Sequence, residues 1–507
     1  MKNILEYLEQ NAAKYPDKII FSDIKNSVTY NDFLTRCKQI GCSLLNTRNN
    51  CVAVFDNRDV NTFISCFGVL YSGNYYADLD SQSPVERLQK IIDTVQPVAI
   101  ICDESNREIL KNLNLNCKIL FIKEILENTE IDEQSLISVR DKMISTDPIY
   151  ALFTSGSTGT PKGTILTHIN VISYIEWYVK AMQIDENTIF ASQHPFYFSA
   201  SVSDVFGTIV TGATLHIIPK SYFSFPIYLV DFMNKNKVNA IYWVPSALNI
   251  IANIDLFKYA KFDYLNKIMF AGEIMPNKQL NYWRKHFPNA TFANLFGPTE
   301  TTDICTYYVV DREFKDDESL PIGKHCDNCD TFIVDENDKL VTEVGVIGEL
   351  LVRSPFVASG YYDNPEKTNS AFVQNPLHNH YPEKVYRTGD LVKINEFGEY
   401  LYAGRKDFQI KHLGYRIELG EIETAAMAIE KVNNVVCLYN SEKDLIILIY
   451  EGKVNQNDII EQLKSKVPYY MVPNVTINIK QMPYNANGKI DRTWLNKNYE
   501  TLIKKED

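Results

Sequence analysis

The chain is poor in cysteine, has no long apolar run and has no excess of positive charge. Only 10 of its 507 residues are cysteine, and their scattered positions are typical of a protein from a reducing compartment. No segment reaches the ~20 consecutive apolar residues that span a bilayer, and acidic residues interrupt the N-terminal apolar pattern, unlike in a signal peptide. The net charge of −12 argues against nucleic acid or an anionic membrane as the main partner. We therefore expect a cytoplasmic protein with neither kind of partner.

One pair of cysteines is close in sequence, Cys326 and Cys329 in "HCDNC". A zinc site usually takes ligands from a second such pair, and the sequence has none at that spacing. The pair therefore does not favour a metal or redox site, and its role stays open.

Short apolar runs such as "CVAVF", "VAIIC" and "AIYWV" alternate with helical patterns along most of the chain. This alternation predicts an α/β fold with buried, mostly parallel strands. From about residue 340 to 405, turn signals break the strand patterns, as in a small β-barrel or antiparallel sheet. Beyond Asp407 the patterns suit a separate small α+β domain. We therefore predict a large domain over residues 1–406 and a small one over residues 407–507.

Glycine and hydroxyl residues crowd the stretch "YALFTSGSTGTPKGTILTH", which starts at Tyr150 and ends at His168. Glycines let backbone N–H groups approach an anion, and hydroxyls add hydrogen-bond donors. Lys162 would supply a full positive charge, and Pro161 would stiffen the loop. Because glycine follows Lys162, this is not a Walker A loop. The alternative is a flexible linker, but a linker needs neither a lysine nor a flanking buried strand, so phosphate binding is favoured.

The segment "LFTSGSTGTPKG" closely resembles the phosphate loop of acyl-adenylate-forming enzymes, the superfamily of acyl-CoA synthetases, luciferases and nonribosomal peptide synthetase adenylation domains. Other motifs of that superfamily follow in the same order between residues 28 and 492. Among them, "GYRIELGEIE" and "NGKIDR" are most similar to the amino-acid adenylating branch. The remaining motifs are "VTYNDF", "VLYSGNYYADLD", "NLFGPTE", "GELLVRSPFVASGYYDNP", "YRTGDL", "GRKDFQIKHL" and "VPYYMVP".

The resemblance implies a site for ATP and Mg²⁺ and a reaction that joins AMP to a carboxylic acid. Phe296 matches the residue whose ring lies along adenine, although the ring could also belong to the core. Glu300 matches the carboxylate that reaches Mg²⁺, and Asp390 the acceptor of the ribose hydroxyls. Lys489 and Arg405, together with Glu300, match the catalytic residues. Further nucleotide contacts are implied for Thr154, Ser155, Gly156, Ser157, Thr158, Gly159, Lys162, Gly272, Glu273, Asn294, Gly297 and Thr299.

The resemblance also implies that the small C-terminal domain is mobile. In this superfamily the domain rotates after adenylation about a hinge residue, which Asp407 matches. The segment "KHLGYRIELGE" would then replace Lys489 at the site and open a tunnel for a phosphopantetheine thiol. His412 and Leu413 depart from the usual "KIRG" pattern, which leaves the details of thiol approach open.

We expect a stand-alone enzyme that acts on a small carboxylic acid and on an acyl or peptidyl carrier protein supplied in trans. The sequence contains no carrier-protein serine motif after Arg492 and no "HHxxxDG" condensation motif before the core. A thiol acceptor must therefore come from another chain.

The most informative departure from the superfamily lies in "YFSASVSDVF", where the acid is expected to bind. In amino-acid adenylation domains an aspartate in "FDxSV" pairs with the α-ammonium of the substrate, and Ser199 replaces it here. A hydroxyl cannot neutralise a desolvated ammonium, so an ordinary α-amino acid should be poorly held. The same alignment implies that the other residues lining the pocket are Ala200, Ser203, Tyr242, Met269, Ala271, Leu295, Asp303 and Ile304.

Asp303 is the only carboxylate among these pocket positions. It could accept a hydrogen bond from a donor at the far end of the substrate, or it could simply cap a helix or face solvent. Ser203 replaces a residue that is often bulky, which should deepen the pocket. We expect first a hydroxylated aromatic acid, 4-hydroxybenzoate being the simplest, and as a close second a β- or ω-amino acid whose amine reaches Asp303; the sequence does not separate the two.

Three other functions compete with this interpretation. An acyl-CoA synthetase would share the chemistry, but the motifs lie closer to the amino-acid adenylating branch. A D-alanine–carrier protein ligase has the right size, but such enzymes keep the aspartate that Ser199 replaces. A catalytically silent nucleotide-binding homologue is disfavoured because Lys162, Glu300, Asp390 and Lys489 are all retained.

Lys489 should serve only the adenylation step. We expect Lys489→Ala to lower ATP–pyrophosphate exchange by about two orders of magnitude or more, since a transition-state charge contact of ~3–4 kcal/mol is lost. Thioester formation from presynthesised acyl-adenylate, followed in a single turnover, should survive. An equal loss in both half-reactions would contradict the assignment.

Overall fold

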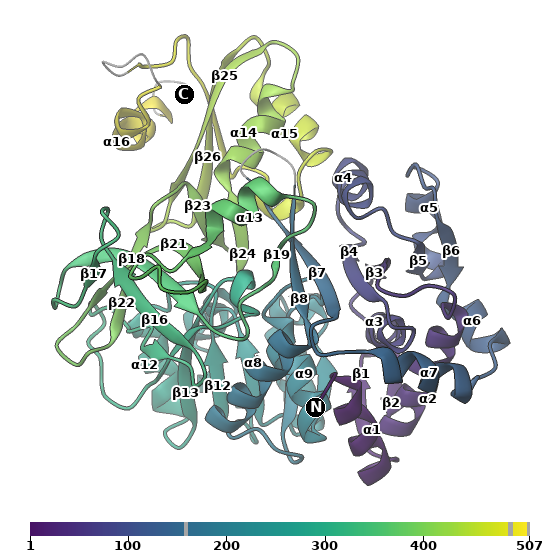
Figure 1. Ribbon diagram of the computed structural model, residues 1–507. Helices are drawn as coiled ribbons and strands as arrows, with labels where there is room; N and C mark the ends of the chain where they lie inside the picture. The colour runs from purple at the N-terminus through teal and green to yellow at the C-terminus, as the bar shows by residue number, and fades with distance from the viewer. Residues whose placement is uncertain (157–160, 485–489, 504–507) are drawn as a thin grey trace.

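Two large β-sheets, with helices packed against them, make up most of the molecule (Figure 1). The computed structural model describes residues 1–156, 161–484 and 490–503. The first sheet has nine strands in the order β15-β14-β13-β12-β11-β9-β10-β1-β2. In this order the strands from β13 to β1 are parallel to their neighbours, whereas the edge strand β2 is antiparallel to β1. These strands are β1 (Ile19–Ser22), β2 (Ser27–Thr29), β9 (Ile189–Ser192), β10 (Thr214–Ile217), β11 (Ala240–Trp243), β12 (Lys267–Phe270), β13 (Thr291–Phe296), β14 (Thr306–Val309) and β15 (Lys324–His325).

The second sheet has seven strands in the order β19-β8-β7-β4-β3-β5-β6, with parallel pairing from β7 to β6. Every residue of β3 is buried, as expected for a parallel strand covered on both faces. The predicted α/β fold is thus confirmed. The strands are β3 (Cys51–Asp56), β4 (Tyr75–Asp80), β5 (Ala99–Cys102), β6 (Lys118–Phe121), β7 (Pro148–Thr154), β8 (Lys162–Thr167) and β19 (Gly360–Tyr361).

One hydrophobic cluster connects the two large sheets through α3 and α9. The rings of Phe67 on α3 and Phe206 on α9 lie 5.4 Å apart in this cluster, between centroids. No helix in the described part of the chain is long and apolar enough to cross a bilayer. The helices are α1 (Leu5–Lys14), α2 (Tyr30–Ser43), α3 (Val60–Tyr71), α4 (Val85–Val95), α5 (Arg107–Leu110), α6 (Ile122–Asn128), α7 (Glu133–Lys142), α8 (His168–Ala181), α9 (Ser201–Thr211), α10 (Pro226–Lys235), α11 (Pro245–Asn253), α12 (Asn277–His286), α13 (Pro365–Ala371), α14 (Leu419–Met427), α15 (Gln456–Lys464) and α16 (Arg492–Ile503).

The segment in which turn signals break the strand pattern contributes most of a third, antiparallel sheet of six strands. After it, the short hairpin β23–β24 leads into a three-stranded sheet covered by α14, α15 and α16. The boundary that we predict between residues 406 and 407 stays a prediction. These strands are β16 (Asp330–Val334), β17 (Leu340–Val341), β18 (Ile347–Arg353), β20 (Phe372–Gln374), β21 (Lys384–Ile394), β22 (Tyr400–Arg405), β23 (Gln409–His412), β24 (Tyr415–Glu418), β25 (Val432–Asn440), β26 (Leu445–Gly452) and β27 (Val475–Asn478).

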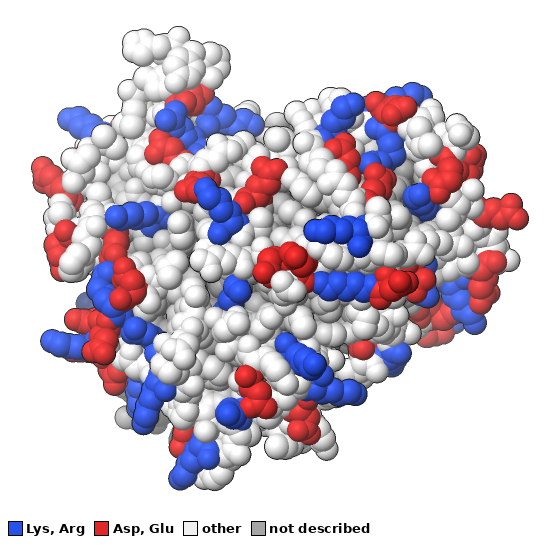
Figure 2. Space-filling view, turned by 90° about the horizontal axis from the view of Figure 1, so that it is seen from below, with Lys and Arg blue, Asp and Glu red and all other residues white. Residues whose placement is uncertain are grey.

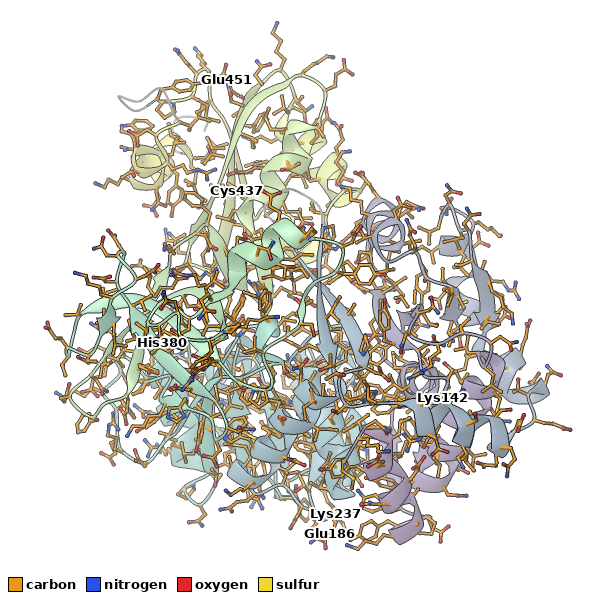
Figure 3. All side chains as sticks on the ribbon, viewed as in Figure 1. Lys142, Glu186, Lys237, His380, Cys437 and Glu451 are labelled. Atoms are coloured by element: carbon orange, nitrogen blue, oxygen red, sulfur yellow. The ribbon has the colours of Figure 1, made fainter. Side chains whose placement is uncertain are left out.

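The three-stranded C-terminal sheet lies at one end of the molecule. Figure 3 shows Cys437 and Glu451 of this sheet at the top, far from Lys237 and Glu186 at the bottom. Between them, β23 and β24 lie next to the large sheets (Figure 1). The face in Figure 2 carries acidic and basic side chains interspersed with one another. This arrangement brings the β23–β24 hairpin, rather than the C-terminal sheet itself, to the large sheets.

Candidate active site

A cavity lies where the β23–β24 hairpin meets the ends of strands from both large sheets. Val244, Gly272 and Gly297, each just beyond the carboxyl end of a parallel strand, line it, and such strand ends are where open α/β sheets bind ligands. Just over half of the predicted site residues that the structure describes therefore meet at one place. Those on the cavity wall are Thr154, Ser155, Ser199, Ala200, Tyr242, Ala271, Gly272, Gly297, Thr299, Asp303, Ile304, Asp390 and Arg405.

Other predicted site residues do not line this cavity. Several of them contact its lining residues or their neighbours, namely Gly156, Lys162, Glu273, Phe296 and Glu300. Four more are buried and do not line the cavity, namely Ser203, Met269, Asn294 and Leu295, and the predicted hinge residue Asp407 is partly exposed and pairs with Arg405. The predictions for Ser157, Thr158, Gly159 and Lys489 fall outside the described residues.

Strands β7 and β8 hold the two ends of the phosphate loop together, because Thr154 pairs with Lys162 across the antiparallel ladder. The Lys162 ammonium lies 3.5 Å from Glu300 Oε1 and 4.0 Å from Glu418 Oε1. Burial lowers the pKa of Lys162 to about 8, with the nearby Arg416 adding to the effect. Lys162 is thus a strongly desolvated cation beside the loop, where it can pair with an anion.

Glu300 is a fully buried carboxylate with partners on both oxygens. The Tyr361 hydroxyl donates to Oε1 at 2.7 Å, and the Arg416 guanidinium donates to Oε2 at 2.6 Å. Burial alone would raise the pKa of Glu300, but Arg416 and Lys162 hold it below its usual range. The carboxylate is therefore ionised and depends on cations from two distant parts of the chain.

Arg405 connects the predicted ribose residue to the predicted hinge. Its Nη1 donates to Asp390 Oδ1 at 3.0 Å and to the Thr388 carbonyl at 2.7 Å. Its Nε and Nη2 donate to the two oxygens of Asp407, at 2.9 and 2.7 Å. A rotation of the backbone at Asp407 would therefore also disturb the Arg405 side chain, which lies beside Asp390.

The β23–β24 hairpin is held to the core by backbone hydrogen bonds at both of its ends. In the turn between β23 and β24, the Gly414 N–H donates a hydrogen bond to the Glu273 carboxylate. On β24, Ser155 Oγ donates to the Arg416 carbonyl at 2.7 Å and accepts from the Glu418 N–H at 3.1 Å. Glu273 and Ser155, which we predict to bind nucleotide, therefore contact the hairpin in this arrangement.

Two hairpin cations at the site were not predicted from the sequence. The Lys411 ammonium lies over the Phe296 ring, 4.8 Å from its centroid, and Arg416 pairs with Glu300. Both belong to the segment expected to replace Lys489, which is the only sequence signal that could have identified them. Arg87 and Glu421, also near the phosphate loop, were missed as well.

Three hydroxyl groups converge on one oxygen of Asp303. Ser203, Tyr174 and Tyr242 donate to Oδ2 at 2.7, 3.1 and 3.2 Å. Tyr174 is fully buried, and its hydroxyl also lies 2.6 Å from Ser203 Oγ. Ser203 is not on the cavity wall, and Tyr174, which was not predicted, lies next to it, so the deeper pocket expected from Ser203 stays a prediction.

The other oxygen of Asp303, Oδ1, has no hydrogen bond from any residue that the structure describes. Burial raises the pKa of the Asp303 carboxyl to about 7, although the hydroxyl donors favour its ionised form. Asp390 is the other carboxylate on the described cavity wall, and Arg405 neutralises it. Ser199, in contrast, contacts only a neutral group, since the Thr299 hydroxyl lies 3.2 Å from its own.

Cys326 and Cys329 are buried free thiols, and Cys305 is buried close to them. Burial raises the pKa of each thiol, so none is a ready thiolate. Across residues 1–156, 161–484 and 490–503, no group of three or more His, Cys, Asp and Glu side chains could hold a metal ion.

A substitution in the turn of the β23–β24 hairpin tests whether docking of the hairpin against the core is needed for acyl transfer. Gly414 has φ +80°, and a Cβ built there would lie 2.5 Å from Val244 Cγ1. We expect Gly414→Ala to lower acyl transfer from presynthesised acyl-adenylate by about tenfold or more, through backbone strain of about 1 kcal/mol and a clash, and to change ATP–pyrophosphate exchange much less.

Gly398→Ala is a matched control, because Gly398 has φ +72° but nothing within 4 Å of its added Cβ. It should carry the same backbone cost without the clash. If Gly414→Ala and Gly398→Ala behave alike in both half-reactions, docking of the hairpin is not needed for acyl transfer.

Comparison with known proteins gives a consistent result. The family model described as AMP-binding enzyme matches residues 8–362. The D-alanine–D-alanyl carrier protein ligase of Lacticaseibacillus casei is 30% identical over 507 residues, covering 97% of this chain and 98% of the ligase. Tyrocidine synthase 3 of Brevibacillus parabrevis is 29% identical over 98% of this chain, which spans only 8% of that protein. The crystal structure of the Vibrio cholerae adenylation domain AlmE, in complex with glycyl-adenosine-5'-phosphate, has the same fold, with a TM-score of 0.84 at 21% identity over 99% of this chain and 98% of that one.

Proposed function

Since the chain belongs to the AMP-binding enzyme family and is an adenylate-forming ligase, we propose that it adenylates a carboxylic acid without an α-amine and passes the acyl group to the phosphopantetheine thiol of a separate carrier protein. Family membership supports the AMP-forming step and the use of ATP. The similarity to a carrier protein ligase and to a peptide synthetase supports the thiol partner. The pocket supports the class of acid.

In the first step, a carboxylate oxygen of the acid attacks the α-phosphorus of ATP, the bond from that phosphorus to the β-bridging oxygen breaks, and pyrophosphate leaves. Lys162 and Arg405 would offset negative charge at the phosphates, and Lys489 would do so at the reacting centre. In the second step, a thiol attacks the acyl carbon, AMP leaves with its electron pair, and the thiol proton goes to solvent. The docked hairpin, with Gly414 and Arg416 on the cavity wall, suits this second step.

The family implies Mg²⁺, and the Glu300 carboxylate is a hard oxygen ligand of the kind that this ion prefers. In the docked arrangement, Tyr361 and Arg416 donate to its two oxygens, so the residue fits the ion once Arg416 has withdrawn. Mg²⁺ bound there would offset the charge of the phosphates. Lys162, which begins β8 in the core, would stay beside Glu300 in either arrangement.

The observation that carries the choice of acid is the pairing of charges in the cavity. With Ser199 at the α-ammonium position and Asp390 neutralised by Arg405, Asp303 is the only carboxylate left to a substrate among the cavity residues that the structure describes. An α-amino acid, including D-alanine, would have no carboxylate beside its ammonium. An acid that carries its donor further from the carboxyl group can instead reach Asp303 Oδ1.

Two features favour an amine over a phenol as that donor. The three hydroxyls on Oδ2 stabilise Asp303 as an anion, and a buried anion gains most from a cation. Tyr174 also contacts Ser203 Oγ at 2.6 Å, and a side chain of this size beside Ser203 would favour a short β- or ω-amino acid over 4-hydroxybenzoate. We therefore rank the amino acid first and the hydroxylated aromatic acid second.

The substrate proposal is tested by ATP–pyrophosphate exchange with a panel of aryl, β-amino, ω-amino and α-amino acids. Analogues that lack the distal donor should lose about 10²- to 10⁴-fold in kcat/KM, because a buried polar group is left unpaired. Asp303→Ala should remove most of that preference. Ser199→Asp should begin to admit α-amino acids. A wild-type preference for a common L-α-amino acid would contradict this account of both residues.

The pH dependence separates the two kinds of donor. Asp303 must be ionised to pair with an ammonium, and its pKa of about 7 means that it becomes protonated as the pH falls below that value. For a β- or ω-amino acid, kcat/KM should therefore fall about tenfold per pH unit below 7. Tyr174 and Tyr242 stay protonated over this range, since burial raises their pKa values further above 10.

Asp303→Asn provides the control for this profile. This substitution should abolish the fall in kcat/KM below pH 7 for the amino acid, because the amide does not titrate. It should also lower the overall rate. A profile that is flat between pH 5 and 8 in the wild type with its best amino-acid substrate would rule out pairing with Asp303.

A further inference from the structure

His412, on the β23–β24 hairpin, pairs with Asp444 in the turn between β25 and β26. Its Nδ1 lies 2.6 Å from Asp444 Oδ1, and its side chain is only 5% exposed. Because an ionised carboxylate only accepts hydrogen bonds, Nδ1 is the donor in this pair. The Tyr439 hydroxyl of β25 donates to the same oxygen at 2.6 Å and to the Lys411 carbonyl at 3.3 Å. Strand β23 is thus tied to the C-terminal sheet just before the turn that docks on the core.

His412 lies on the face of β23 that is turned away from the cavity. Its neighbour Lys411 lines the cavity and lies over the Phe296 ring, and successive side chains of a strand point to opposite faces. The His412 ring instead meets the Tyr439 ring edge to face, with the centroids 6.0 Å apart. His412 can therefore affect the reaction only through the position of the hairpin.

The other side of the turn contacts a carboxylate of the core. Glu273 accepts hydrogen bonds from the Gly414 N–H and, at 2.8 Å, from the Ser246 N–H. Burial raises the pKa of Glu273 in opposition to these donors, and the negative charge of Asp444 adds to the rise. Asp444 thus disfavours the ionised form of Glu273, which is the stronger acceptor for the Gly414 N–H. Docking of the hairpin therefore brings together two carboxylates that repel each other, one from the core and one from the C-terminal sheet.

We propose that His412 is a positioning residue for acyl transfer, which holds Asp444 and offsets its charge so that the Gly414 N–H can dock on Glu273. This inference rests on the proposed function, in which the docked hairpin serves the second step. An imidazole N–H offsets part of the charge of a carboxylate, and a protonated ring offsets all of it. Without His412, Asp444 would oppose Glu273 and the turn would spend less time docked.

The experiment compares His412→Leu with the double variant His412→Leu/Asp444→Asn. Docking is measured in the free enzyme by deuterium uptake of the backbone amides of residues 409–418. Acyl transfer to pantetheine is measured in a single turnover from the presynthesised adenylate of the best acid in the panel. Asp444 has φ +53°, a left-handed conformation that asparagine also tolerates, so the second substitution removes the charge and keeps the turn.

His412→Leu should speed deuterium uptake and slow acyl transfer, each about three- to tenfold. The effect is modest because Asp444 is 45% exposed and solvent screens its charge. ATP–pyrophosphate exchange should change by less than about twofold, since the first step does not use the docked hairpin. The double variant should return both deuterium uptake and acyl transfer toward the wild type, because no charge is left to oppose Glu273. His412→Asn, which keeps an N–H donor but no positive charge, should fall between the wild type and His412→Leu.

His378→Leu is the matched control, because His378 also pairs with a carboxylate, Glu383 at 2.9 Å, but lies between β20 and β21 outside the hairpin. It should change neither deuterium uptake of the hairpin nor acyl transfer. Thermal unfolding shows whether each variant is folded, and His412→Asn keeps the test open if His412→Leu is not.

The inference is overturned if the double variant is as slow in acyl transfer as His412→Leu, since the pair would then only pack the C-terminal part together. It is also overturned if His412→Leu lowers both half-reactions alike or leaves acyl transfer unchanged. The expected pattern of deuterium uptake, with no acyl transfer by the wild type, would instead refute the proposed function.

Discussion

Glu300 is a fully buried carboxylate, and a buried charge is stable only beside a partner of opposite charge. Its partners come from two parts of the chain: Lys162 from the core and Arg416 from the β23–β24 hairpin. Withdrawal of the second cation would be costly unless another cation replaced it, and Mg²⁺ bound there in the proposed function would meet that need. Arg87 is the converse case, a buried cation whose anionic partner Glu421 also comes from the C-terminal part of the chain. The position of the C-terminal part and the charge at the phosphate loop are therefore coupled.

The pocket follows the same rule of charge pairing. Asp390 is neutralised by Arg405, whereas three neutral hydroxyls and the charge of Lys411 favour the ionised form of Asp303, whose Oδ1 has no hydrogen bond from any residue that the structure describes. A buried carboxylate with no directly paired cation costs stability at neutral pH, where it is partly ionised. In the proposed function, a cationic substrate would offset that cost, so that Asp303 would select the acid rather than stabilise the fold.

Much of this could be predicted from the sequence, because motif residues sit at the ends of strands whose order the α/β pattern indicates. Thr154, Gly297 and Asp390 meet at one cavity as expected. The role of Tyr174 could not be predicted, since its contact with Asp303 depends on how α8 packs against residues 129 positions away. Arg87 and Glu421 are 334 positions apart, and their pairing depends on the orientation of the C-terminal part, which no local pattern determines. The neighbour of Ser203 could not be predicted for the same reason, because a small residue at one position does not indicate which side chain packs next to it.

The central claim is that the cavity selects an acid without an α-amine, and direct competition tests it most simply. The enzyme would be incubated with ATP, Mg²⁺ and an equimolar mixture of the common L-α-amino acids, D-alanine, short β- and ω-amino acids and hydroxybenzoates, and the bound adenylate would be identified by mass spectrometry. The account predicts the adenylate of a β- or ω-amino acid, with a hydroxybenzoyl-adenylate as the second choice. The adenylate of an α-amino acid would contradict it.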